Sequence, residues 1–155
     1  MASLPAPTTM LEPDGCWRLL RRSDVGRLAV IVDERPEIFP VNYAVDGGSV
    51  VFRTAPGAKL TAVASSPAVA FEVDGHDEDS DEAWSVVVKG RADIVHGFIQ
   101  LLDTTSLTVF PWQASKKSQF VRVVADEVTG RRFRRVDPSF WDTPLSGAAR
   151  RAGRT

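Results

Sequence analysis

The chain has 155 residues, of which 43% are hydrophobic and 25% are charged, a composition typical of one soluble globular domain. Its 19 basic and 20 acidic side chains nearly cancel, so no overall field would attract nucleic acid or a membrane surface. The single cysteine excludes an internal disulfide, and Met1 to Gly15 contains no apolar run of signal-peptide length. We therefore expect a cytoplasmic protein with no nucleic-acid or membrane partner.

Both ends of the chain lack a periodic apolar face. Residues 1–13 are rich in proline, and residues 143–155 end in a loose arginine tail. Segments of this kind bury too little apolar surface to become ordered by themselves. The sequence therefore predicts a flexible N-terminus over 1–13, a folded domain over 14–142 and a flexible basic tail over 143–155.

Three short helices are predicted from apolar residues at helical spacing. Asp14 is a candidate cap for the first, in which Cys16, Leu19 and Leu20 share one face. The second spans 57–66, where Pro67 prevents continuation, and the third covers 98–105.

The remaining ordered segments are predicted as strands, because they are β-branched or aromatic runs bounded by turn residues. Asp46-Gly47-Gly48 is a strong hairpin turn, and the acidic segment 74–82 is expected to be a solvated loop. The predicted strands are 26–32, 37–45, 49–54, 68–73, 84–95, 120–124 and 129–136, of which the last two form a closing hairpin. Closure removes exposed strand edges, so we predict a mainly β fold, a six- to seven-stranded antiparallel, Greek-key-like barrel with three short helices.

The most informative segment is FRTAPGAKL, Phe52 to Leu60, in which a predicted strand passes through a Pro-Gly turn into a helix. Arg53 offers a planar guanidinium, Thr54 a hydroxyl and Lys59 an ammonium, while a helix start offers free backbone N–H groups. These groups are the donors that proteins use for phosphate. From the pattern alone, a solvated turn with incidental cations is the alternative interpretation.

The same segment carries a family resemblance, together with PVNYAV (40–45), GRLAVIV (26–32), WSVVVKGRA (84–92) and VTGRRF (128–133). With these motifs the chain resembles the pyridoxamine 5′-phosphate oxidase-like proteins of the flavin-binding split-barrel fold, including the nitroimidazole-reductase-like subfamily. The resemblance implies a homodimer that binds FMN in grooves between its subunits.

The resemblance also implies roles for individual residues. Arg53, Thr54 and Lys59 would hold the phosphate, backbone groups of 41–43 would follow the isoalloxazine edge, and Trp112 would cover the ring from the partner subunit. The full cofactor-binding set implied in this way is Pro40, Val41, Asn42, Tyr43, Phe52, Arg53, Thr54, Lys59, Leu60 and Trp112.

The function implied is that of a flavin-dependent oxidoreductase acting on a small electron-accepting substrate. Two alternatives stay open at this point: a non-catalytic flavin or haem binding or storage protein, and a deazaflavin-dependent reductase. His76 and His96 have no metal-ligand spacing, so no metal site is predicted. The sequence offers no conspicuous base or nucleophile, and no catalytic residue is predicted because the cofactor would carry the reactivity. The arginines of 131–135 are interpreted as a solvated face.

Overall fold

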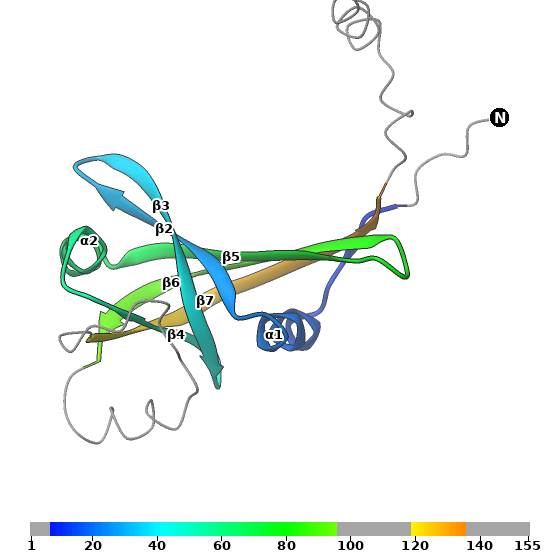
Figure 1. Ribbon diagram of the computed structural model, residues 1–155, viewed down its shortest axis with the longest axis horizontal. Helices are drawn as coiled ribbons and strands as arrows, with labels where there is room; N and C mark the ends of the chain where they lie inside the picture. The colour runs from blue at the N-terminus through cyan, green and yellow to red at the C-terminus, as the bar shows by residue number, and fades with distance from the viewer. Residues whose placement is uncertain (1–6, 96–118, 136–155) are drawn as a thin grey trace, which may run out of the picture.

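The structure is a computed structural model that describes residues 7–95 and 119–135 (Figure 1). Its elements in chain order are β1 (Thr9–Met10), α1 (Pro13–Arg21), β2 (Val25–Val32), β3 (Arg35–Asp46), β4 (Ser49–Thr54), α2 (Ala58–Ser65), β5 (Ala68–Asp77), β6 (Glu82–Ile94) and β7 (Gln119–Arg134). Neither of the two helices in these ranges is long and apolar enough to cross a membrane. The predicted third helix at 98–105 lies outside the described residues.

The seven strands form one antiparallel sheet in the order β1-β7-β4-β3-β2-β5-β6, and an additional pairing of β7 with β6 closes it. The closed ring therefore contains every strand except β1, which extends the sheet along the free part of β7. Figure 1 shows α1 and α2 at opposite ends of this barrel. The mainly β split-barrel fold predicted from the sequence is confirmed.

The strand β3 changes its partner along its length. Residues Arg35–Asn42 pair with β2, whereas Tyr43–Asp46 pair with β4. β4 continues beyond this point through Arg53 and Thr54, which pair with β7. The part of β3 that precedes Tyr43 therefore no longer pairs with β4. The barrel is split at this place, where the chain leaves β4 for α2.

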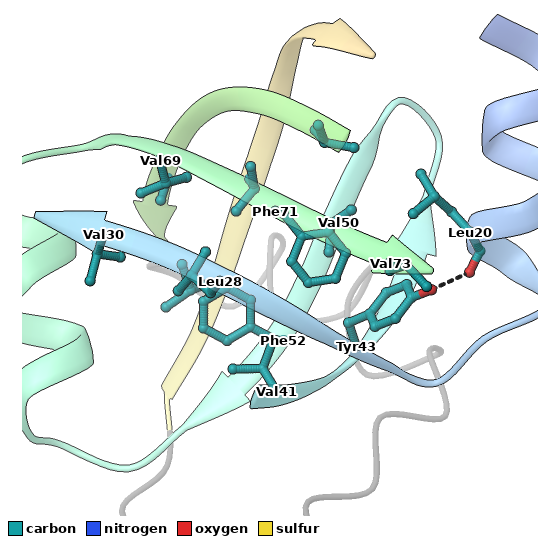
Figure 2. Close-up of a cluster of buried hydrophobic side chains, with 14 of the residues drawn as sticks. Leu20, Leu28, Val30, Val41, Tyr43, Val50, Phe52, Val69, Phe71 and Val73 are labelled. Carbon is teal, nitrogen blue, oxygen red and sulfur yellow. Dashed lines mark hydrogen bonds between the residues drawn. The ribbon is translucent and has the colours of Figure 1, made fainter. Parts of the chain in front are cut away.

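The core side chains alternate with more exposed ones along β2, β5 and β6, as expected for a sheet with one buried face, whereas five of the six residues of β4 are buried. Figure 2 shows Phe52 and Phe71 at its centre, both fully buried. Tyr43 packs edge-on against Phe71 with ring centroids 4.8 Å apart, and its hydroxyl donates a hydrogen bond to the Leu20 carbonyl of α1 (Figure 2). This contact fastens the first helix to the barrel.

The buried hydroxyl of Tyr43 makes the stability of the protein sensitive to alkaline pH. Burial raises the pKa of Tyr43 above its ordinary value near ~10, because the phenolate would lose its hydration. Above that pH the unfolded chain releases the proton while the folded chain keeps it, so the free energy of unfolding must fall by up to about 1.4 kcal/mol per pH unit. We expect urea unfolding to show a steeper loss in the parent than in Tyr43→Phe, which keeps only the contribution of the buried Cys16 thiol, whose pKa burial also raises. Because the chain has one tyrosine, the absorption of tyrosinate reports on this group alone. A parent and a variant that lose stability in parallel above this pH would contradict the prediction.

The helices follow the sequence prediction closely. Cys16, Leu19 and Leu20 are buried on one face of α1. The N-cap is Glu12 rather than Asp14, because Pro13 occupies the first helical turn and needs no N–H partner there. α2 begins after Gly57 and ends before Pro67, as predicted.

Three strand predictions are corrected by the structure. β7 is one continuous strand of 16 residues, so the predicted closing hairpin is wrong. The strands β5 and β6 extend into the acidic segment and leave only Glu78–Asp81 as the turn, because ten pairs of residues join them. Thr9 and Met10 form β1 by pairing with Arg132 and Arg131, although they lie in the segment predicted to be flexible. The partners of β1 and β7 lie far away in the sequence, where local patterns do not reveal them.

Candidate functional site

The chain turns from β4 into α2 at the segment that carries the candidate phosphate donors. Thr54 is the last residue of β4 and is buried, and its hydroxyl donates to the Ala55 carbonyl at 3.2 Å. Gly57 caps α2, and its carbonyl accepts the Thr61 amide at 3.0 Å, closing the first helical turn. The amides of that turn precede the helical hydrogen bonds and point out of the helix start. The turn therefore presents backbone donors beside the end of β4.

Each of the two cations in this segment lies over an aromatic ring. The Nζ atom of Lys59 is 5.5 Å from the centre of the Phe39 ring, and Cζ of Arg53 is 5.7 Å from the centre of the Phe120 ring. Both distances are within the range of cation–π attraction. Both cations are half-buried, so each has part of its side chain shielded from water. The rings belong to different strands, since Phe39 is on β3 and Phe120 is on β7.

Successive side chains of β4 point to opposite faces of the sheet, and this separates the predicted donors. Phe52 and Thr54 are buried on the inner face, whereas Arg53 lies between them in sequence and pairs with Phe120. The side chains of Arg53 and Thr54 therefore leave the strand in different directions, and the Thr54 hydroxyl already has a backbone acceptor. The three predicted donors therefore lie at the junction of β4 and α2, but the side chains of Arg53 and Thr54 point to opposite faces of β4.

The other predicted contacts come from β3. The side chains of Val41 and Tyr43 are buried in the core, so they present no side-chain surface to a ligand. Pro40 is exposed and Asn42 is half-buried. Phe52 is fully buried in the barrel core, so its side chain is not exposed at the surface of this chain.

Two of the predicted site residues cannot be placed. Trp112 and the side chain of Leu60 lie outside the part of the chain that the structure describes. Sequence reasoning also missed two aromatic residues, Phe39 and Phe120. The alternation of Phe39, Val41 and Tyr43 on one face of β3 was a usable signal for the first of them.

We call the region where the pairing of β3 with β4 ends, between 40–43 of β3 and 53–59 of the β4–α2 turn, the β3–β4 split. It differs from a shallow hollow of about 320 Å³ on the outer face of β6 and β7, which contains none of the predicted site residues. That hollow is lined by Met10, Ser85, Val87, Thr129, Gly130, Arg131 and Phe133. Within 7–95 and 119–135, no three His, Cys, Asp or Glu side chains are grouped closely enough to hold a metal ion.

The fold and the split define a class, the split-barrel proteins. Residues 12–132 match the pyridoxamine 5′-phosphate oxidase family, which is more than half of the chain, so the chain belongs to that family. Among curated relatives, the uncharacterized protein Rv3129 of Mycobacterium tuberculosis is 43% identical over 90 residues, which are 58% of this chain and 80% of Rv3129.

Solved structures extend the comparison to the whole barrel. The FAD binding protein from Mycobacterium smegmatis is 39% identical, with a TM-score of 0.69 over 81% of this chain and 100% of that protein. A heme binding protein from the same organism is 18% identical, with a TM-score of 0.58 over 68% of this chain and 48% of that protein, which shows a shared fold alone.

Proposed function

We propose that this protein binds FMN at the β3–β4 split. The observation that carries the proposal is the pair of half-buried cations, Arg53 and Lys59, held over aromatic rings on either side of the turn into α2. Cations and the N-terminal end of a helix both stabilise the negative charge of a phosphomonoester, and the turn into α2 supplies both. The isoalloxazine ring is assigned to the backbone of 41–43, where β3 no longer pairs with β4.

The donor chemistry of the split fits this cofactor. FMN and FAD share the isoalloxazine ring and the phosphate next to the ribityl chain, so the similarity to the FAD binding protein from Mycobacterium smegmatis supports a flavin as the cofactor. FMN is favoured because the cationic turn needs only one phosphate group. A haem site would need an axial ligand, and the described histidine, His76, lies at the end of β5 with its side chain about half exposed.

We assign the protein to the flavin-dependent oxidoreductases acting on a small electron-accepting substrate. A bound flavin supplies hydride or electron transfer. The contribution of the chain is to hold the phosphate through Arg53 and Lys59 and to orient the ring along β3. No described side chain is given a catalytic role.

Two observations on the purified protein test this function. An absorption spectrum with flavin bands, retained after gel filtration with added FMN, would support the cofactor, whereas a Soret band would contradict it. Reduction of the bound flavin by a nicotinamide nucleotide and reoxidation by an acceptor would support an oxidoreductase. A flavin that binds but stays oxidised under these conditions would contradict the enzyme and support a carrier.

We propose that the functional unit is a homodimer joined through the outer face of β2 and β3. Three large apolar side chains of this face, Val25, Ile31 and Ile38, are exposed by 44%, 43% and 66%, although the face also includes the ion-paired Arg27. Ile31 and Ile38 both face outward, because they pair with Pro36 and Ala29 across the hairpin. Apolar patches of this kind mark interaction surfaces. A second copy placed here would also cover Pro40, and with it the ring end of the proposed flavin site.

Ile38→Asp is expected to weaken the dimer by at least ~30-fold, since a carboxylate would be buried at the interface without a partner. Analytical ultracentrifugation at micromolar concentration measures the dissociation constant. The matched control is Val124→Asp, because Val124 is an exposed residue of β7, on the opposite side of the ring, and should leave the dimer intact. A parent that is monomeric, or an Ile38→Asp variant that dimerises like the parent, would contradict the proposed interface.

A further inference from the structure

Phe39 is held in place on the β3 side of the split. It pairs with Leu28 of β2, in the part of β3 that has left β4, and its half-buried side chain packs against the core cluster. A ring held between a strand and the core has little freedom to rotate away. Phe39 is therefore an aromatic surface at the β3–β4 split whose position is fixed by strand pairing, whereas a ring on a loop would be free to move.

Lys59 reaches this ring from the other side of the split. It lies in the first turn of α2, and its ammonium is 5.5 Å from the centre of the Phe39 ring. A lysine side chain has four rotatable bonds and loses much conformational freedom when it is fixed. The attraction of the ring for the ammonium offsets part of this loss before any ligand arrives.

We infer that Phe39 is a positioning residue, which holds the Lys59 ammonium at the split for a phosphomonoester. An ammonium has three N–H donors, and those turned away from the ring stay available to anion oxygens. The Phe39 ring thus fixes the position of the Lys59 ammonium and leaves some of its N–H donors available. This inference rests on the proposed function, and it adds a residue that determines preference for the phosphorylated over the unphosphorylated flavin.

Phe39→Leu tests the inference, because it keeps an apolar side chain and removes the aromatic face. We expect the dissociation constant for FMN to rise about 2- to 5-fold, which is the range for an exposed to half-buried cation–π contact. Riboflavin should bind as in the parent. Phe39→Tyr, which keeps the aromatic face, should bind FMN within about 2-fold of the parent. Phe133→Leu is the matched control, since Phe133 lines the separate hollow on β6 and β7.

A second background shows whether the effect passes through the cation. In Lys59→Met, the further change Phe39→Leu should leave FMN affinity unaltered. Equal or tighter FMN binding by Phe39→Leu alone would overturn the inference, because the ring would then be neutral or would hold the ammonium away from the phosphate. A fall in riboflavin binding by the same factor, or a loss that persists in Lys59→Met, would overturn it as well.

The failure of the proposed function can be told apart from the failure of this inference. If the parent bound neither FMN nor riboflavin, the flavin assignment would fail. Inorganic phosphate would then serve as the probe, with its effect on the Tm compared in the parent and in Phe39→Leu. A smaller rise in Tm for the variant supports a Lys59 ammonium positioned by the ring. An equal rise, or no rise in the parent, overturns it.

Discussion

Replacing Lys59 with alanine is expected to weaken FMN binding by roughly 30- to 150-fold, the equivalent of about 2–3 kcal/mol for one charge-assisted contact in a partly enclosed site. Riboflavin affinity should change little, because the ammonium is assigned to the phosphate. Lys59 is half-buried at the start of α2, with its ammonium over the Phe39 ring. Its removal therefore takes away a charge that is already located at the split. Fluorescence quenching of each flavin on titration with protein gives both affinities.

The control for this change is Lys89→Ala. Lys89 is an exposed residue of β6 whose Nζ lies 3.9 Å from Glu127, so its removal lowers the positive charge equally at a remote place. FMN affinity should then stay close to that of the parent. If Lys59→Ala bound FMN like the parent, or lost riboflavin just as strongly, the turn would be structural. The phosphate would then have to be sought elsewhere, with Arg131 and Arg132 as the next candidates.

Gly90→Ala is expected to destabilise the protein by at least ~3 kcal/mol, a large share of the 5–15 kcal/mol typical of a domain. A Cβ atom at this position would lie 1.9 Å from the carbonyl oxygen of Val124 and 2.8 Å from its carbon. Both atoms belong to the backbone of β7, so no side-chain rotation relieves the clash. The register between β6 and β7 shifts at this point, with Lys89 opposite Glu127 and Gly90 opposite Ala125. The glycine is therefore required for the bulge that keeps β7 continuous.

Urea unfolding measures this loss as a change in midpoint and in extrapolated free energy. Gly48→Ala is the matched control, because nothing lies within 4 Å of a Cβ atom built at that turn residue. It should change the free energy of unfolding by less than about 1 kcal/mol. A Gly90→Ala protein as stable as Gly48→Ala would show that the two strands can separate locally without cost, contrary to the closed barrel.

Local features of the sequence predicted the parts of the fold that depend on local chemistry. The helix after Gly57 follows from apolar spacing and a terminating Pro67, and both signals lie within ten residues of each other. The turn at Gly47-Gly48 follows from glycine, which adopts the observed positive φ of 60° at Gly47 at no steric cost. These elements form wherever the rest of the chain goes, so a single sequence suffices to predict them.

Two of the wrong strand predictions, those for β1 and β7, depend on pairing between distant residues. The acids at 126 and 127 look like a turn, yet the bulge opposite Gly90 accommodates the additional residue and β7 continues. Thr9 and Met10 carry no strand signal of their own and are ordered by Arg131 and Arg132. The β3–β4 split is also non-local, because it arises where the pairing partner of β3 changes between β2 and β4.

The candidate site was predicted in part for the same reason. FRTAPGAKL identified Arg53, Thr54 and Lys59 from their own segment, and the structure places them at the turn into α2. The aromatic partners Phe39 and Phe120 come from β3 and β7, so only the assembled barrel reveals them. The inward direction of Phe52 and Thr54 follows from the alternation of β4, once its register is known.

A titration of the parent protein with FMN and with riboflavin measures directly whether the flavin is recognised through its phosphate. The two compounds share the isoalloxazine ring and differ by the group assigned to Lys59 and Arg53. We predict that FMN binds at least ~30-fold more tightly than riboflavin, as the loss of one charge-assisted contact requires. Equal dissociation constants for the two compounds would contradict a phosphate site at the β3–β4 split.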